Sequence, residues 1–255
     1  MRCDRWCPRG SEGTSALATE GDNSGAGATP RVPHDAIITR IVERAPGTRS
    51  FFLRLSAAQR FVFKPGQFIS CLLPIGGQTM LRPYSLASSP GDPEIEICLN
   101  RVPGGVGTAY LFGLEVGAPL RFTGPWGTFI LEEPPAAECV FIADGTGVAA
   151  IRPMLWRALR GPGAHPIRLH YAAVSRAHLL YADEIEAAAR AHAQFTFVPL
   201  LGTPLTEEIE RRYVNADHDR SRHFFICGVG DIVPRLRDLL RRSGYERRAV
   251  QYEKW

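Results

Sequence analysis

The fold of this 255-residue chain is decided by one short stretch, Phe141-Ile142-Ala143-Asp144-Gly145-Thr146-Gly147-Val148. A compact apolar run ends here in a turn with two glycines, and a helix-like pattern follows at residues 151–159. A strand that leads through a tight turn into a helix is typical of a parallel sheet, where such strand ends bind nucleotide pyrophosphates. Two glycines are a weak signal alone, so the flanking sequence has to support the interpretation.

Downstream of this stretch, apolar strands alternate with helices. We expect strands at residues 139–143, 167–174, 195–200, 224–227 and 249–252, with helices at 151–159, 180–192, 207–213 and 233–242. This alternation predicts an α/β domain, a doubly wound parallel sheet covered on both faces, which we assign to residues 135–255.

Upstream, the pattern is that of short antiparallel strands. We expect them at residues 36–42, 50–55, 67–73, 81–87, 94–102 and 119–123, with Pro-Gly or Gly-Gly pairs at many of the turns. Polar and apolar residues nearly alternate over residues 94–100, as they do on a half-buried sheet. The sequence therefore predicts a β domain, an antiparallel barrel or sandwich, in residues 32–134, ahead of the α/β domain.

Composition and charge exclude several classes of protein. Residues 1–31 are poor in large apolar side chains and lack the pattern of a secretory signal, so we interpret them as a disordered extension. The net charge of +4 is dispersed, which argues against a nucleic-acid partner and permits an acidic protein partner without indicating one. No apolar run approaches the roughly 20 residues of a membrane span.

The six cysteines give no support for a metal site. Cys71, Cys98, Cys139 and Cys227 lie within apolar runs, as small hydrophobic residues do, and no C-x-x-C pair occurs. We predict no metal and a reducing cytoplasmic location.

The first candidate binding motif is Arg82-Pro83-Tyr84-Ser85. A guanidinium can donate two hydrogen bonds to a phosphate, and a tyrosine ring can lie on a planar ligand. On a regular strand Arg82 and Tyr84 share one face, and Ser85 lies on the other unless the strand bends. An ordinary strand with an exposed arginine and a packed tyrosine is an equally good interpretation of this segment alone.

Two further motifs are rich in glycine. Gly104, Gly105 and Gly107 expose backbone N–H groups, and Thr108 can cap a short helix that begins there. A plain glycine-rich turn is the simpler interpretation. Cys227-Gly228 stands at another strand end that opens a helix, where a buried small residue is the simpler interpretation, and Tyr252-Glu253-Lys254-Trp255 ends the chain.

In this order the motifs resemble the ferredoxin–NAD(P) reductase family of flavoenzymes. The resemblance covers residues 34–255 and includes Gly124-Pro125-x-Gly127-x-Phe129 and Leu180-Tyr181-x-Asp183-Glu184. It implies a Greek-key β-barrel that binds FAD, followed by an α/β domain that binds NAD(P)H. The Gly104–Thr108 loop favours FAD over FMN.

The resemblance also implies roles for individual residues. Arg82, with Pro83 and Tyr84, would hold the flavin and its phosphates, Ser85 would stand near flavin N5, and the loop of Gly104, Gly105, Gly107 and Thr108 would bind the pyrophosphate. Gly145, Thr146 and Gly147 would face the nicotinamide nucleotide, with Cys227, Gly228 and Glu253 at its ring. Trp255 or Tyr252 would cover the flavin. Ser85, Cys227 and Glu253 are the predicted catalytic residues.

Such an enzyme moves a hydride between NAD(P)H and flavin and passes electrons to a partner. Because neither end of the chain carries a C-x4-C-x2-C motif, we expect a separate acceptor, which is a ferredoxin, an oxygenase component, a cytochrome or free flavin. A reductase of free flavin or quinone is an alternative within the same class. A non-catalytic or regulatory flavin-binding subunit is an alternative from another class.

Four residues depart from the pattern of the family: Asp144, Ala150, Val174 and Val229. An aspartate beside a pyrophosphate is unfavourable unless it points away. The segment Leu201-Gly202-Thr203 offers no cation for the 2′-phosphate of NADPH, and we expect Arg176 to be a solvated surface residue. The sequence therefore favours NADH.

Overall fold

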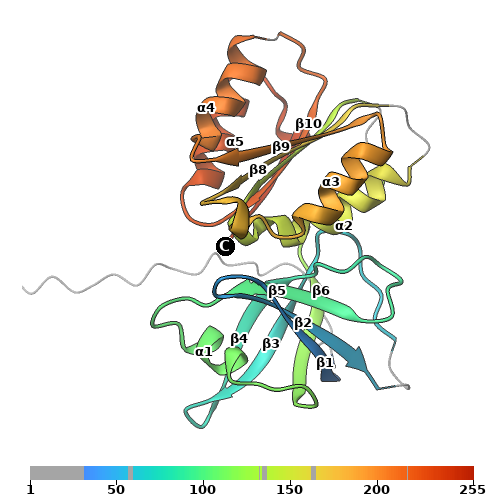
Figure 1. The fold of residues 1–255 in the computed structure, drawn as a ribbon, viewed down its shortest axis with the longest axis vertical. Helices are drawn as coiled ribbons and strands as arrows, with labels where there is room; N and C mark the ends of the chain where they lie inside the picture. The colour runs from blue at the N-terminus through green and yellow to red at the C-terminus, as the bar shows by residue number, and fades with distance from the viewer. Residues whose placement is uncertain (1–31, 57–59, 132, 134–136, 162–164, 217) are drawn as a thin grey trace, which may run out of the picture. The chain divides into compact units, whose positions relative to one another are not determined.

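The computed structural model describes residues 32–56, 60–131, 133, 137–161, 165–216 and 218–255. These residues form two sheets, one of six strands and one of five (Figure 1). The predicted disordered extension and the predicted domain boundary at residues 134 and 135 lie outside the described residues, so both stay predictions.

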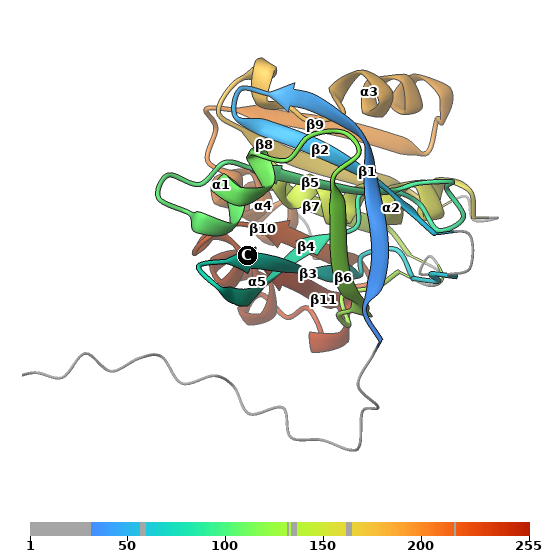
Figure 2. The same ribbon diagram turned by 90° about the horizontal axis from the view of Figure 1, so that it is seen from below.

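The first sheet is an antiparallel barrel built from residues 34–126. Its elements are β1 (His34–Ala45), β2 (Thr48–Leu55), β3 (Phe68–Ile75), β4 (Gln78–Ser85), β5 (Ile95–Asn100), α1 (Val106–Phe112) and β6 (Pro119–Trp126). The strand order β4-β3-β6-β1-β2-β5 is a Greek-key arrangement, seen from below in Figure 2. A bridge between Leu86 and Ile97 joins the two end strands and closes the barrel.

Alternation along β5 decides what lies inside this barrel. Ile95, Ile97 and Leu99 belong to the barrel core, together with residues such as Phe51 and Phe122. Because successive side chains of a strand point to opposite faces, Glu96 and Cys98 face the other way. Cys98 accordingly belongs to the core that lies under the second sheet.

The second sheet is parallel, in the order β11-β10-β7-β8-β9. Its elements are β7 (Cys139–Asp144), η1 (Gly145–Gly147), α2 (Val148–Leu159), β8 (Ile167–Ala173), η2 (Arg176–His178), α3 (Ala182–Ala191), β9 (Phe195–Leu201), α4 (Leu205–Glu210), η3 (Arg211–Asn215), β10 (His223–Gly228), α5 (Ile232–Arg242), η4 (Arg247–Ala249) and β11 (Val250–Lys254). We call residues 34–131 the barrel half and residues 139–255 the α/β half.

Both faces of the parallel sheet are covered, as the sequence predicts. On β7, Phe141 and Ala143 pack with α2 and α3, whereas Val140 and Ile142 pack with α4 and α5. The first of these cores also contains barrel residues, including Ala87 and Cys98, so the two halves share a hydrophobic core. The predicted fold class, a Greek-key barrel followed by a doubly wound parallel sheet, is confirmed.

Some predicted helices differ in extent, and the one expected at residues 151–159 begins at Val148. The helix expected at residues 207–213 begins at Leu205, and its last part, Arg211–Asn215, is π-helical. The earlier start follows from Leu205, which is buried in the core, and from Glu207 and Glu208, whose charges suit the first turn of a helix. The described helices include none that is long and apolar enough to cross a membrane.

Candidate functional site

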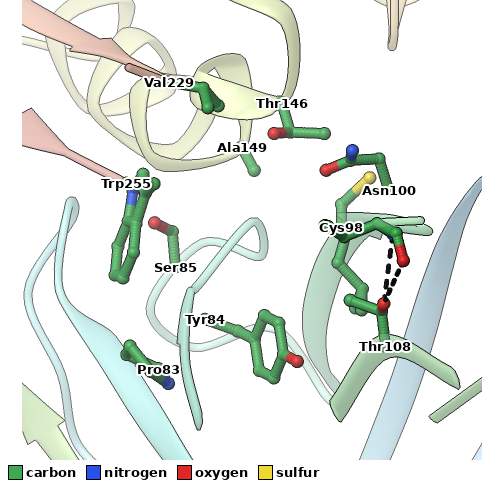
Figure 3. Close-up of a pocket in the computed structure, with 12 residues that line it drawn as sticks. Pro83, Tyr84, Ser85, Cys98, Asn100, Thr108, Thr146, Ala149, Val229 and Trp255 are labelled. Carbon is green, nitrogen blue, oxygen red and sulfur yellow. Dashed lines mark hydrogen bonds between the residues drawn. The ribbon is translucent and has the colours of Figure 1, made fainter. Parts of the chain in front are cut away.

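A cavity of about 200 Å³ lies where the barrel half meets the α/β half (Figure 3). The barrel half contributes eight lining residues, Pro83, Tyr84, Ser85, Cys98, Leu99, Asn100, Val102 and Thr108. The α/β half contributes Thr146, Ala149, Val229 and Trp255. Segments that are far apart in the sequence therefore meet at one site.

The end of β4 supplies three consecutive residues to this cavity. Pro83, Tyr84 and Ser85 all line it, although strict alternation would turn Ser85 to the opposite face. β4 ends at Ser85, so the regular alternation of its side chains ends at the cavity. Ser85 is buried, and burial raises the pKa of the Tyr84 hydroxyl. The site thus presents a neutral phenol and a buried hydroxyl.

Arg82 lies against the first turn of α1. A Cβ added at Gly107 would stand 3.0 Å from Cγ of Arg82, so the arginine packs directly on this glycine. One guanidinium nitrogen donates to the carbonyl of Leu81 at 2.8 Å. Arg82 has no carboxylate partner among the described residues, which leaves its positive charge available to an anion beside the glycine loop.

Thr108 does not cap α1, contrary to the prediction. The helix begins at Val106 with Gly105 as its N-cap, so Thr108 lies inside the first turn. Its hydroxyl donates to the carbonyl of Gly105 at 3.1 Å and accepts from the amide of Val102 at 3.1 Å. Thr108 therefore fastens the glycine loop, which includes Gly104, to the end of β5. The sequence could not distinguish a threonine at the N-cap from one inside the first turn, because both positions favour a hydroxyl that bonds to nearby backbone.

Glycine is required where β7 and β10 end side by side. A Cβ at Gly147 would stand 2.2 Å from the carbonyl oxygen of Cys227, and a Cβ at Gly228 would stand 2.9 Å from Cβ of Asp144. No larger residue fits at Gly147 without moving the backbone. Cys227 is 1% exposed, and burial raises the pKa of its thiol, so it remains protonated and does not line the cavity.

Glu253 is brought next to Ser85 by strand pairing at the end of the chain. β11 pairs with β10, which sets Glu253 opposite Cys227. Burial raises the pKa of the Glu253 carboxyl to about 8, although a hydrogen bond from Ser85 opposes the shift. Its second oxygen, Oε2, is buried and has no hydrogen-bond partner among the residues that the structure describes. The carboxyl is therefore largely protonated at neutral pH, behind the hydroxyl that lines the cavity.

Of the two candidate aromatic residues at the end of the chain, Trp255 lies at the cavity. Its indole packs edge-on against Phe68 at a centroid distance of 5.5 Å, and in Figure 3 it lies beside Ser85. Tyr252 lies under the guanidinium groups of Arg237 and Arg241, at 5.1 and 5.5 Å, and does not line the cavity.

A second cavity, of about 420 Å³, adjoins the first and shares Asn100, Thr146 and Val229 with it. Gly145 and Asp144 also line it. Asp144 is half-buried, and burial raises the pKa of its carboxyl. The aspartate that departs from the family pattern therefore faces this cavity instead of pointing away from it.

Sequence reasoning missed six lining residues of this cavity, namely Cys98, Asn100, Leu99, Val102, Ala149 and Val229. The alternation in residues 94–100 could have indicated the first two, because it sets them on the face opposite to the barrel core. Ala149 and Val229 carry no chemical signal, and only the meeting of the two halves brings them to the site.

Comparisons with known proteins identify both halves. A family model described as an oxidoreductase FAD-binding domain matches residues 35–130, and one described as an oxidoreductase NAD-binding domain matches residues 141–234. The ferredoxin–NADP reductase B of Sorangium cellulosum is 32% identical over 238 residues, which cover 88% of this chain and 98% of that protein. The electron transfer component of toluate 1,2-dioxygenase from Pseudomonas putida is 26% identical, and this chain spans 69% of its length.

Solved structures agree with this assignment. A cytochrome P450 reductase from Amycolatopsis superposes with a TM-score of 0.78 at 28% identity, covering 91% of this chain and 73% of that one. A ferredoxin NADP⁺ reductase from Neisseria gonorrhoeae, solved with FAD and NADP, has the same fold, with a TM-score of 0.75, 20% identity and coverage of 87% and 98%. The chain therefore belongs to the ferredoxin–NAD(P) reductase family of FAD-binding, NAD(P)H-dependent oxidoreductases.

Proposed function

We propose that the chain binds the flavin of FAD at the first cavity and NADH at the second, and that it delivers electrons to a separate redox protein. The observation that carries this proposal is the meeting of Tyr84 and Ser85 with Thr146 and Trp255 around one cavity, with the Glu253 carboxyl behind Ser85. When bound, FAD accepts a hydride from the nicotinamide and releases its two electrons one at a time.

The residues at the first cavity fit FAD. A dinucleotide presents two negative phosphates and a flat ring system. Arg82, which pairs with no carboxylate in the described part of the chain, offers a cation beside the N–H groups of Gly105 and Gly107. Tyr84 offers an aromatic face. The buried, unpartnered oxygen of Glu253 leaves hydrogen-bonding capacity at the site.

Each residue then has a distinct task. Arg82, Gly105 and Gly107 hold the pyrophosphate, with Thr108 fastening their loop and Gly104 and Pro83 shaping it. Tyr84 and Trp255 bind the ring and exclude water from it. Gly145, Thr146 and Gly147 hold the nicotinamide nucleotide. The close contact of Gly147 with the backbone of Cys227 and Gly228 fixes the position of this binding segment.

Ser85 and Glu253 hold and release a proton at the site. Because the pKa of the Glu253 carboxyl is raised to about 8, this group holds a proton near neutral pH and can release it through a small change in its surroundings. The Ser85 hydroxyl joins the carboxyl to the cavity. The Cys227 thiol stays neutral and acts through its position.

NADH is the preferred nucleotide in this proposal. The guanidinium of Arg176, the first cation that follows β8 in the sequence, is held by the Glu186 carboxylate at 2.8 Å. Recognition of a 2′-phosphate would require this pair to break. The end of β9, Leu201-Gly202-Thr203, offers no cation in its place.

A ferredoxin or an oxygenase component is the proposed acceptor, in a cytoplasmic location. Two relatives are named for such systems, a ferredoxin–NADP reductase and a dioxygenase electron transfer component. The propane 2-monooxygenase reductase of Mycolicibacterium goodii is 32% identical over 175 residues, and this chain spans about half of its length.

Spectroscopy of the purified chain tests the proposal. We expect a yellow protein after reconstitution with FAD, whose visible absorbance bleaches within seconds of mixing with NADH, and faster electron transfer to a ferredoxin than to free flavin or quinone. A colourless protein would refute flavin binding. Because Asp144 faces the second cavity, the second candidate is a flavin-binding subunit without reductase activity, and a yellow protein that NADH leaves oxidised would favour it.

A further inference from the structure

A buried polar cluster joins the two halves beside the cavity. Glu96 of β5 is 3% exposed, and its Oε1 accepts from the Ser50 hydroxyl at 2.5 Å, the Tyr181 hydroxyl at 2.8 Å and the Arg44 guanidinium at 2.9 Å. Ser50 and Arg44 belong to the barrel half, whereas Tyr181 precedes α3 of the α/β half. One buried carboxylate is therefore held from both sides of the interface.

Arg152 of α2 makes the second connection. One of its nitrogens donates to the carbonyl of Ala87 at 2.6 Å and lies 3.5 Å from Oε2 of Glu96. The rest of its guanidinium forms a bidentate pair with the carboxylate of Glu184 on α3. A single side chain thus binds the backbone two residues after Ser85, the buried carboxylate of the barrel half and the neighbouring helix.

Tyr181 is held in an unfavourable backbone conformation at the centre of the cluster. Its φ of 60° is the only positive value for a non-glycine residue in the described chain. Such a conformation is unfavourable for a residue with a Cβ. Its ring lies between the guanidinium groups of Arg44 and Arg152, each 4.8 Å from the ring centroid. The strain persists because contacts from both halves hold the residue.

The cluster is directly connected to the walls of the cavity. Cys98, two residues after Glu96 on the same face of β5, lines the cavity. Arg152 follows Ala149, another wall residue, by three positions on α2, so the two share a side of the helix. A shift of the cluster therefore moves the cavity wall at Cys98 relative to the cavity wall at Ala149.

We propose that Tyr181, Glu96 and Arg152 are positioning residues that fix the α/β half on the barrel and thereby set the approach of nicotinamide to flavin. The inference rests on the proposed function. Hydride transfer needs reacting atoms about 3–3.5 Å apart, and a displacement of 1 Å can cost about 100-fold in rate. A hydrogen-bonded buried ion cluster suits this task because it favours one geometry more than it adds stability.

Tyr181→Phe is the first test, because it keeps the ring between the two guanidinium groups and removes only the hydroxyl that donates to Glu96. We expect flavin reduction at saturating NADH to slow about tenfold. The dissociation constant of FAD and the KM for NADH should change less than about twofold, since no binding group is removed. The matched control is Tyr213→Phe, which removes a buried hydroxyl bonded to His170 at 2.8 Å within the α/β half alone.

Hydrogen exchange in the flavin-free chain gives a readout that does not depend on activity. We expect the amides of residues 85–88 and 146–152 to exchange faster in Tyr181→Phe than in the wild type or in Tyr213→Phe. Arg152→Met should slow flavin reduction and speed up amide exchange more than Tyr181→Phe does. Arg152→Lys, which keeps the positive charge, should bring both values part of the way back to those of the wild type. The control is Arg157→Met, farther along α2, which breaks the ion pair of Arg157 with Glu133. It should change neither the rate of flavin reduction nor the amide exchange.

The outcomes separate this inference from the proposed function. Equal rates of flavin reduction and equal exchange in Tyr181→Phe and Tyr213→Phe would overturn the positioning role. A wild-type chain that NADH does not reduce would refute the proposed function. In that case the exchange comparison still decides whether the cluster holds the halves together, and unchanged exchange overturns the inference.

Discussion

The two halves of the molecule build their sides of the site in different ways. The barrel half uses side chains, with Arg82, Tyr84 and Ser85 at the end of one strand. Where β7 and β10 end, the α/β half uses backbone, because Gly147 and Gly228 let these two strand ends approach until no Cβ fits between them. We therefore expect substitutions in the barrel half to change binding and substitutions at these glycines to change folding.

Gly147→Ala should have the largest effect. The new Cβ would stand 2.2 Å from a backbone oxygen that cannot rotate away, so the ends of β7 and β10 must separate. We expect the free energy of unfolding to fall by about 4 kcal/mol or more, measured by denaturant unfolding of the flavin-free chain.

Gly145→Ala is the matched control for this comparison. Gly145 has a φ of +53° but nothing within 4 Å of its Cβ position, so only the backbone conformation opposes the substitution. We expect a loss of about 1–2 kcal/mol. Equal losses in the two variants would contradict the view that close packing, and not glycine flexibility, shapes this side of the site.

The same contrast explains what the sequence could predict. Hydrophobic patterns indicated both sheets, because apolar runs such as β7 reflect burial directly. The alternation in residues 94–100 indicated a strand but wrongly predicted that only one face is buried, since Glu96 and Cys98 are buried as well. Arg82 and Tyr84 were recognisable because their side chains carry the chemistry. Thr108 was placed at the right loop with the wrong function, since a threonine can bond the backbone at a cap or one turn inside the helix.

Other features arise only when distant segments meet. Ser85 and Glu253 come from different sheets, and the raised pKa of the Glu253 carboxyl depends on burial that no local pattern records. Tyr181 belongs to a motif that the sequence shows, yet its partners Glu96 and Arg152 come from β5 and α2. Polar contacts between residues that are far apart in the sequence leave no periodic pattern in it, so only the tertiary structure reveals them.

Glu253→Gln should change how stability depends on pH. The unfolded carboxyl ionises near its ordinary pKa of 4.5 and the folded one near 8, so the wild-type chain loses stability as the pH rises between these values. The glutamine does not ionise, so the variant should lack this loss, which we expect to be about 4 kcal/mol between pH 5 and pH 9.

Unfolding by denaturant at pH 5 and pH 9 measures the difference. Glu43→Gln, at an exposed glutamate of β1, is the control and should keep the wild-type dependence on pH. A wild-type chain that is equally stable at both values would show that the Glu253 carboxyl is ionised in the folded state, and the proposed proton-holding function would fail.

Arg82→Met should weaken FAD binding while leaving the fold intact. Charge-assisted hydrogen bonds to a phosphate are worth about 1.5–3 kcal/mol, so we expect the dissociation constant to rise about 10- to 100-fold. Fluorescence titration of the flavin-free chain with FAD measures it. Arg121→Met, which removes an exposed arginine paired with Asp35 on the same barrel, should leave the constant unchanged. A similar rise in both variants would indicate a general effect of charge.

Arg176→Met should have the smallest effect and sharpens the comparison at the nucleotide side. Because the guanidinium is already held by Glu186 at 2.8 Å, its removal should change the catalytic efficiencies with NADH and NADPH by less than about twofold. An arginine that bound a 2′-phosphate would behave differently, since losing a charged hydrogen bond there would lower the NADPH efficiency alone by about tenfold or more. Steady-state kinetics with both nucleotides distinguish these results. A selective loss with NADPH would mean that Arg176 leaves Glu186 on binding, and that a side chain, as in the barrel half, recognises the nucleotide.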